Sequence, residues 1–186
     1  MQIISLLDLL EEIGEEATKE ILSNFSVSRN HDVEHFIQSL AVPYEKSNNA
    51  RTFLFLSDSL KPLGFVSLSL TSLVLPSGIS ENLKKKLRGY GRSSSESIPC
   101  YLIGQLARFD SVMKEELSGN DMFSIIADDI DTAYQIFGGR VVSIDCSDEL
   151  VHYYEKRGFV VLNKIGNLNQ MVYLIRDIRH DLKSQQ

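Results

Sequence analysis

Residues 99–107, Pro99-Cys100-Tyr101-Leu102-Ile103-Gly104-Gln105-Leu106-Ala107, are almost continuously apolar. A short run of this kind is typical of a central strand that is buried on both faces of a sheet. Residues 119–137 then place apolar side chains at helical spacing, and Gly138-Gly139 end that periodicity. A second apolar run follows at residues 140–145. The order strand, helix, strand predicts a parallel strand pair joined by a crossover helix.

The segments on either side extend this arrangement. Residues 147–157 predict a short helix, and residues 159–162 and 170–174 predict two final strands. On the N-terminal side, residues 64–73 alternate apolar and polar side chains. Together with residues 52–56 they predict a β-hairpin.

Helical spacing dominates the first forty residues. The apolar positions of the first predicted helix recur at intervals of three and four and are Leu6, Leu10, Ile13, Ala17 and Ile21. Residues 33–41 predict a second helix, with Ser28 or Asn30 as its N-cap. The sequence therefore predicts the α/β class, with one mixed sheet and flanking helices in a single domain. We place that domain at residues 1–176, with N-terminal helices at 5–42 and a polar tail at 177–186.

The charge balance and the cysteines narrow the class of protein. The 186 residues carry a net charge of −6, which argues against a nucleic-acid partner and against an anionic membrane surface. The start of the chain lacks the basic segment of a signal peptide, and no apolar run approaches the ~20 residues of a bilayer span. Cys100 and Cys146 lie in apolar segments without CxxC spacing, which predicts reduced core thiols. We therefore expect a cytoplasmic protein.

Two segments carry residues suited to chemistry. The predicted helix that begins at Gly119-Asn120 follows a buried strand and a polar loop, so its N-terminus presents backbone N–H groups that suit a phosphate. The pair Tyr153-Tyr154 lies in the short helix before Gly158-Phe159. A tyrosine can protonate a departing thiolate, because its ordinary pKa of about 10 lies above that of a thiol.

Four segments together resemble the GNAT-type N-acetyltransferase superfamily, in particular its toxin-related and phage-associated bacterial branch. The most specific one is residues 153–159, Tyr-Tyr-Glu-Lys-Arg-Gly-Phe, one helix after an apolar strand that ends in Ile144-Asp145-Cys146. Residues 25–57, 64–70 and 102–107 are similar to the opening helix and strand, the Gly-aromatic strand and the fourth strand of that superfamily.

The resemblance implies an N-acetyltransferase that moves an acetyl group from acetyl-CoA to a primary amine by direct attack. Its thiolate-protonating tyrosine matches Tyr154. Pantetheine would lie along Leu106, Ala107 and Arg108, where this strand splays from its parallel neighbour, and the pyrophosphate along Lys114, Ser118, Gly119 and Asn120. The sequence departs from the family pattern in this loop, since Lys114 replaces Arg or Gln and Leu117 replaces a glycine.

Several alternatives stay open at this point. The acceptor is a small-molecule, peptide or aminoacyl amine, and no carboxylate stands out as the base among Asp110, Asp145 and Glu155. A toxin acting on aminoacyl-tRNA, a degenerate CoA- or protein-binding module, and an interaction module using residues 88–96 are the rivals. Oligomerisation is compatible with the sequence.

Two further clusters are weaker signals. His31 and His35 have the spacing of two metal ligands on one helix, but no third ligand accompanies them, so we predict no metal site. Residues 84–86, three lysines in a short helix capped by Ser80, lie close to Arg88 and Arg92. This cluster is either a solvated surface or a contact for the 3′-phosphate of CoA or for an RNA acceptor.

Overall fold

The structure, a computed structural model, describes residues 1–92 and 94–175 of the chain. The predicted tail at 177–186 lies outside the described residues, and the domain bounds 1–176 stay a prediction. The strands are β1 (Gln2–Ser5), β2 (Arg51–Leu56), β3 (Pro62–Val74), β4 (Ser97–Arg108), β5 (Val141–Cys146), β6 (Val160–Ile165) and β7 (Leu168–Leu174). The helices are α1 (Leu6–Ile13), α2 (Glu15–Ser23), α3 (His31–His35), the π-helical segment η1 (Phe36–Leu40), α4 (Ala41–Lys46), α5 (Glu81–Arg88), α6 (Gly119–Phe137) and α7 (Asp148–Glu155).

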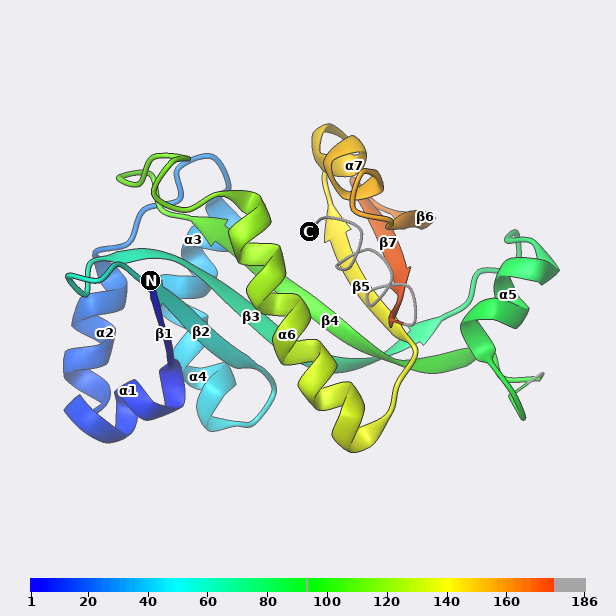
Figure 1. Cartoon of the computed structure of the whole chain (residues 1–186), viewed down its shortest axis with the longest axis horizontal. Helices are drawn as coiled ribbons and strands as arrows, with labels where there is room; N and C mark the ends of the chain where they lie inside the picture. The colour runs from blue at the N-terminus through cyan, green and yellow to red at the C-terminus, as the bar shows by residue number, and fades with distance from the viewer. Residues whose placement is uncertain (93, 176–186) are drawn as a thin grey trace. The chain divides into compact units, whose positions relative to one another are not determined.

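The described strands form one mixed sheet in the order β1-β2-β3-β4-β5-β7-β6. Strands β4 and β5 run parallel, with Tyr101–Ile103 paired to Val142–Ile144. Helix α6 lies between these two strands in the sequence, so the predicted crossover is confirmed, and with it the mixed α/β fold (Figure 1). The splay of the parallel pair stays a prediction.

The chain divides into two compact units. Unit 1 comprises Met1–Ser69 and Gly104–Ile126, and unit 2 comprises Leu70–Ile103 and the described residues from Ala127 onward. Strands β3 and β4 and helix α6 contribute residues to both units.

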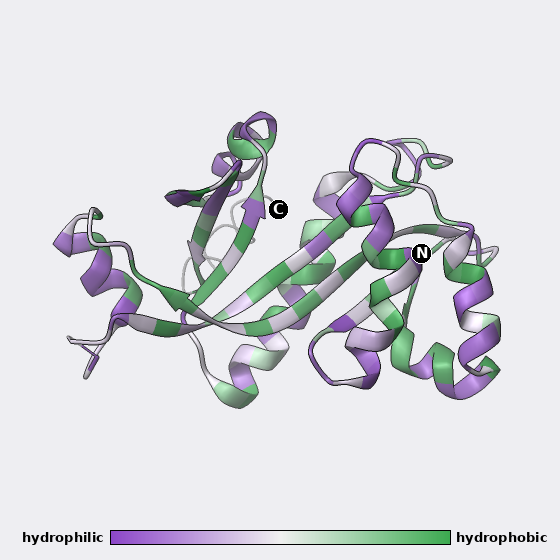
Figure 2. Ribbon diagram, turned by 180° about the vertical axis from the view of Figure 1, so that it is seen from behind, coloured by the Kyte–Doolittle hydropathy of each residue, from purple (hydrophilic) through white to green (hydrophobic). Residues whose placement is uncertain are grey.

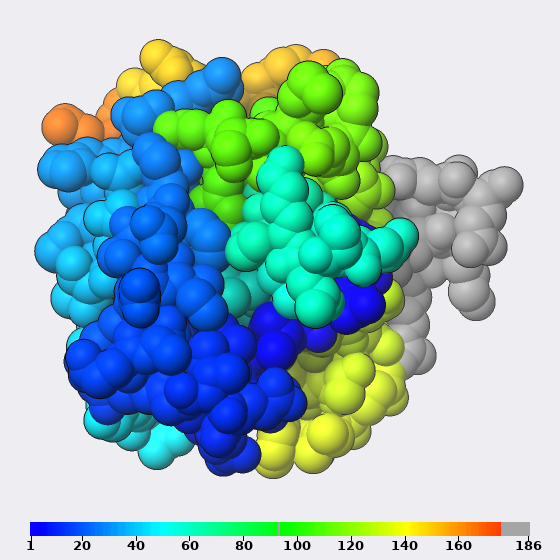
Figure 3. All heavy atoms as spheres, turned by 90° about the vertical axis from the view of Figure 1, so that its left-hand side faces the viewer, coloured from blue at the N-terminus to red at the C-terminus, as the bar shows by residue number. Residues whose placement is uncertain are grey.

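Unit 1 is built around a row of aromatic rings. Phe25 stacks on Phe109 with ring centroids 4.2 Å apart, and Phe65 stacks between Phe109 and Phe36 at 6.1 and 6.2 Å. Burying each large apolar side chain stabilises the fold by about 1.5–3 kcal/mol. In Figure 3 the N-terminal helices (blue) and the segment near residues 110–118 (green) form neighbouring parts of this unit's surface.

The N-terminus corrects one prediction. The single helix expected over residues 6–21 is two helices, α1 and α2, because Gly14 between them adopts a φ of 81°. Glycine reaches this region without the steric cost that a Cβ would add. The break rotates the two apolar faces apart, so Leu6 and Leu22 are buried while Ile13 and Ile21 are exposed. Residues 2–5, which were assigned to no element, form the edge strand β1 on β2.

One buried charge joins α4 to β2 in unit 1. The side chain of Glu45 is fully buried and accepts hydrogen bonds from the Thr52 backbone N–H at 2.7 Å and from the Arg51 guanidinium at 3.0 Å. Burial raises the pKa of Glu45, and these two donors oppose that shift.

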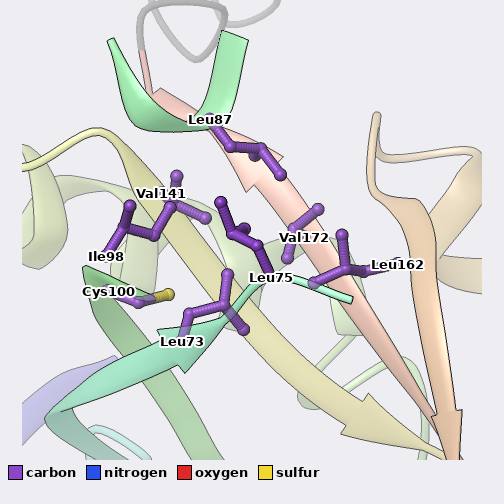
Figure 4. Close-up of a cluster of buried hydrophobic side chains, with 8 residues drawn as sticks. All are labelled: Leu73, Leu75, Leu87, Ile98, Cys100, Val141, Leu162 and Val172. Carbon is purple, nitrogen blue, oxygen red and sulfur yellow. The ribbon is translucent and has the colours of Figure 1, made fainter. Parts of the chain in front are cut away.

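Unit 2 has its own apolar core, shown in Figure 4. The buried members are Leu73, Leu75, Leu87, Ile98, Cys100, Val141, Leu162 and Val172. Helix α5 covers this core with Leu87 and is otherwise largely hydrophilic (Figure 2). Cys100 and Cys146 are buried free thiols, as predicted. Among the described helices none combines the length and the apolar character that a membrane span requires.

Candidate active site

The loop that precedes α6 is fixed to the rest of unit 1 at both ends. At its start, the Phe109 backbone N–H donates to the Leu63 carbonyl at 3.0 Å. The Asp110 carboxylate accepts from the Ser28 backbone N–H at 2.8 Å and from the Ser26 hydroxyl at 3.1 Å. At its end, the Leu117 side chain is fully buried. Leu117, which stands where the resemblance would place a glycine, therefore anchors the loop through apolar burial.

The predicted pantetheine segment lies beside β3. A Cβ on Gly64 would lie 2.5 Å from the Ala107 carbonyl oxygen and 3.2 Å from the Arg108 Cα, so only glycine allows this close approach. Leu106 and Arg108 are half-buried, and Ala107 is buried. The Arg108 guanidinium donates to the Leu117 carbonyl at 3.2 Å, which ties the end of β4 to the end of the loop.

The first turn of α6 contains a capping box that the sequence analysis missed. The Ser118 hydroxyl accepts from the Asp121 backbone N–H at 3.2 Å, and the Asp121 carboxylate accepts from the Ser118 backbone N–H at 2.9 Å. The Ser118 hydroxyl also lies 2.6 Å from the Asp121 carboxylate and can donate to it, and this bond, together with the one from the Ser118 N–H, lowers the pKa of Asp121. The signal was present in the sequence, since Ser-x-x-Asp before an apolar run has this spacing. One of the amides predicted to hold a phosphate therefore already binds a carboxylate.

Glu116, another charged residue of the loop, also has partners within the protein. Glu116 accepts from the Met113 backbone N–H at 2.9 Å and lies 3.2 Å from the Lys61 ammonium. Lys114 and Asn120 are exposed, whereas Gly119 is half-buried. The predicted phosphate segment thus brings Lys114, Ser118, Gly119 and Asn120 into one loop and helix start, together with the carboxylates of Glu115, Glu116 and Asp121.

The candidate acid, Tyr154, lies on the last turn of α7 in unit 2. Its side chain is only 6% exposed and meets Tyr153 and Phe159 edge-on, with ring centroids 5.2 and 5.8 Å away. Burial, with a smaller effect of Tyr153 and Cys146, raises the pKa of Tyr154 well above its ordinary value. The phenol therefore holds its proton at neutral pH, which a general acid requires.

The neighbouring tyrosine is held differently. Tyr153 is half-buried, and the Arg157 guanidinium carbon lies 3.5 Å from the centre of its ring. The same guanidinium donates to the Tyr153 carbonyl at 2.8 Å. The sequence analysis did not single out Arg157, whose i, i+4 spacing from Tyr153 was the available signal.

The three carboxylates considered as bases differ in their surroundings. Asp110 is bonded by Ser26 and Ser28, and these bonds lower its pKa. Glu155 lies 3.8 Å from the His152 ring nitrogen on the exposed side of α7. Asp145, at the end of β5, is exposed by its accessible surface, and partial desolvation by the surrounding protein raises its pKa.

The side chains of the two weaker clusters differ in their exposure. Within residues 1–92 and 94–175, no three His, Cys, Asp or Glu side chains gather as metal ligands. His31 and His35 are exposed. Ser80 caps α5, as predicted, and Lys84 donates to Glu81 at 2.7 Å, whereas Lys85 and Lys86 are exposed.

Comparison with solved structures decides the fold. A Tyr-to-Phe mutant of KacT superposes with a TM-score of 0.68 at 16% identity, covering 97% of this chain and 99% of that one. AtaTR bound with acetyl-CoA gives 0.67 at 17% identity, covering 97% of each chain. The fold is that of the GNAT-type acetyltransferases. No protein-family model matches this chain, and no curated protein sequence matches it either.

A third similar structure bears on the charge argument. AtaT complexed with acetyl-methionyl-tRNA shares the fold at a TM-score of 0.67 and 16% identity, covering 87% of this chain and 91% of that one. A GNAT-type fold of this kind is thus compatible with a nucleic-acid partner. The expectation that a net charge of −6 argues against such a partner is not supported. A chain-wide average does not describe the local charge that a nucleic acid meets.

Proposed function

We propose that the chain is an acetyl-CoA-dependent N-acetyltransferase that acetylates a primary amine, with Tyr154 as its general acid. The observation that carries this proposal is a buried tyrosine, held protonated, at the position where the GNAT-type motif has its acid. The likeness in fold to AtaTR bound with acetyl-CoA supports the same donor.

The residues of unit 2 supply the proton. Bound acetyl-CoA supplies an activated thioester acetyl group and leaves as a thiol. Tyr154 holds a proton on its hydroxyl oxygen and releases it as negative charge develops on the departing sulfur. The edge-on contacts with Tyr153 and Phe159 fix the ring, so the hydroxyl needs little reorientation.

The residues of unit 1 would hold the donor. Leu106, Ala107 and Arg108 offer strand backbone, and the helix start at Ser118, Gly119 and Asn120, with Lys114, offers N–H groups and a cation for phosphates. The chemistry of these groups fits a pyrophosphate with one condition. The Asp121 carboxylate accepts from the Ser118 N–H, so it must either release this N–H or share it with the phosphate.

A specific comparison favours one acceptor. AtaT, which shares this fold, is found complexed with acetyl-methionyl-tRNA. We therefore propose the amino group of an aminoacyl-tRNA as the first acceptor to test, ahead of small-molecule and peptide amines. The acceptor amine must attack the thioester carbonyl as the neutral form and loses a proton as the amide forms, and Asp145, whose pKa is raised, is the carboxylate that we propose to accept this proton.

The experiment is a thermal shift with acetyl-CoA, followed by an acetylation assay over amines, peptides and aminoacyl-tRNA. At a hundred times Kd, a ligand that binds only the folded state adds about 2.7 kcal/mol of stability. Gly119→Glu should abolish this shift, because it places a negative charge at the helix start. No shift at millimolar acetyl-CoA in the parent chain would refute the proposal. A shift without turnover of any acceptor would favour a CoA-binding module instead.

A further inference from the structure

Unit 2 contains a cavity of about 470 Å³ that includes neither Tyr154 nor any residue predicted to hold the pantetheine or the pyrophosphate of acetyl-CoA. Two of its lining residues, Arg88 and Arg92, belong to the basic cluster for which the sequence left a phosphate or RNA contact open. Its walls come from the end of α5 and the loop after it, the start of β4, and the turn that follows α6. The volume lies in the range of about 300–1,000 Å³ typical of sites for small organic ligands.

The floor of this cavity is apolar and its rim is aromatic. Leu87, Ile98 and Cys100 line it and belong to the core shown in Figure 4. Tyr90 and Phe137 line it as well, although both are almost fully exposed. Two exposed rings beside an apolar floor suit a flat, apolar ligand group, because a ring face gains most from stacking.

The charged side chains of the cavity are all cationic. Arg88, Arg92 and Arg140 line it, and no Asp or Glu is among the described lining residues. A planar guanidinium pairs with a phosphate through two parallel N–H···O bonds, which is stronger than a contact with a neutral group. The cavity thus offers anion recognition beside its apolar floor.

Two of these arginines are held in position before any ligand arrives. The Arg140 guanidinium donates to the Lys86 carbonyl at 2.9 Å and lies across Gly89, where a Cβ would come within 2.7 Å of its Nε. The Arg88 Nε–H donates to the Ser95 carbonyl at 2.7 Å. Each of these bonds uses one of the five N–H groups of its guanidinium. Because the bonds hold both side chains in place, less conformational entropy is lost when a ligand binds.

We propose that this cavity binds a nucleotide, with the base against Tyr90 and Phe137 and the phosphate on the arginines. A flat apolar body and an anionic group in one small molecule match the two kinds of surface that the cavity presents. The nucleotide is either a free mononucleotide or the terminal nucleotide of a single-stranded RNA. This inference does not depend on acetyl transfer.

The test is calorimetric titration of the full chain with adenosine monophosphate, adenosine, inorganic phosphate and a single-stranded adenosine tetraribonucleotide. Adenosine monophosphate should bind more tightly than adenosine or phosphate, since only it fills both surfaces. Tyr90→Ala should weaken its binding by about 5- to 150-fold, the effect of losing one stacked base. Because the Tyr90 ring is exposed, this variant should keep the parent melting temperature.

Arg92→Gln should also weaken binding, and Lys85→Gln is its matched control. Both remove one exposed positive charge, but only Arg92 lines the cavity. Equal losses in both variants would overturn the proposal in favour of diffuse charge attraction. Failure of both adenosine monophosphate and the tetranucleotide to bind at millimolar concentration would overturn it outright. Tetraglutamate, an anion without a base, is titrated as well, and tighter binding of tetraglutamate than of adenosine monophosphate would also overturn the proposal. A tetranucleotide that binds more tightly than the monophosphate identifies the RNA end as the ligand, and equal affinities identify the free nucleotide.

Discussion

The loop of residues 109–121 in unit 1 and the arginine cavity in unit 2 are both places where an anion could bind, and they have opposite surroundings. In the loop, the carboxylates of Asp110, Glu116 and Asp121 each accept a hydrogen bond from a backbone N–H of unit 1. In the cavity, the charged lining residues are arginines. A protein with a net charge of −6 thus keeps a cationic cavity, because its acidic residues lie elsewhere.

The contrast separates two roles of a carboxylate near backbone amides. Asp121 stabilises the start of α6 by satisfying an N–H that would otherwise lack a partner in the helix. The same contact places a negative charge where a phosphate is predicted to bind. Stability and anion affinity therefore oppose each other in the loop, whereas the fixed Arg88 and Arg140 of the cavity show no such conflict.

The largest expected effect concerns neither anion region but the buried phenol of unit 2. Tyr154→Phe keeps the ring and its edge-on contacts and removes only the proton donor. We expect kcat to fall by about 10²- to 10⁴-fold, the usual contribution of general acid catalysis. The affinity for acetyl-CoA should stay the same, because the hydroxyl acts mainly in the transition state. Steady-state kinetics with the best acceptor and calorimetry with acetyl-CoA check both parts.

Tyr153→Phe is the matched control. Its hydroxyl is the only group lost, and the ring remains under the Arg157 guanidinium. We expect near-parental kcat. If Tyr153→Phe is instead the inactive variant, the motif register is off by one. Equal activity of both variants would remove tyrosine from the mechanism and leave solvent as the proton source.

Local patterns in the sequence were sufficient for most elements of the fold. The helix at 119–137 and the strands on both sides of it appear where periodicity predicts them. The misses lie at the N-terminus. A glycine within a helical pattern gives no local sign of whether it continues or breaks the helix, so the break at Gly14 was missed. Strand β1 has four residues and depends on pairing with β2, some fifty residues later, which no local window contains.

The site was predictable to a different degree. The motif around Tyr154 is continuous in the sequence, so local reasoning could single this residue out; the structure buries its side chain, and its role as the acid stays a prediction. The sequence left Arg88 and Arg92 open as a phosphate or RNA contact, but it did not predict the cavity, because Arg140 lies about fifty residues further along the chain. Only the fold brings Arg140 across Gly89.

The next largest effect concerns the close approach of the β3 backbone at Gly64 to the β4 backbone at Ala107. In Gly64→Ala the new Cβ would lie 2.5 Å from the Ala107 carbonyl oxygen, and backbone cannot move aside as a flexible side chain can. We expect a loss of about 1–3 kcal/mol in the free energy of unfolding, the usual cost of overpacking. Urea denaturation measures it. Gly78→Ala is the control, because nothing lies within 4 Å of its Cβ position. A Gly64→Ala variant as stable as Gly78→Ala would contradict the contact.

The smallest effect tests the opposition between capping and anion binding directly. Asp121→Asn keeps an oxygen that can accept from the Ser118 N–H and removes the negative charge from the first turn of α6. A charge at a helix N-terminus contributes about 0.3–1 kcal/mol, so we expect a two- to fivefold gain in acetyl-CoA affinity and a small loss of stability. Asp128→Asn, an exposed change two turns further along the helix, alters net charge equally and should leave the affinity unchanged. Calorimetric titration of both variants with acetyl-CoA measures the two affinities. Equal gains would mean that net charge alone governs binding, and no gain in Asp121→Asn would show that the phosphates lie away from this helix start.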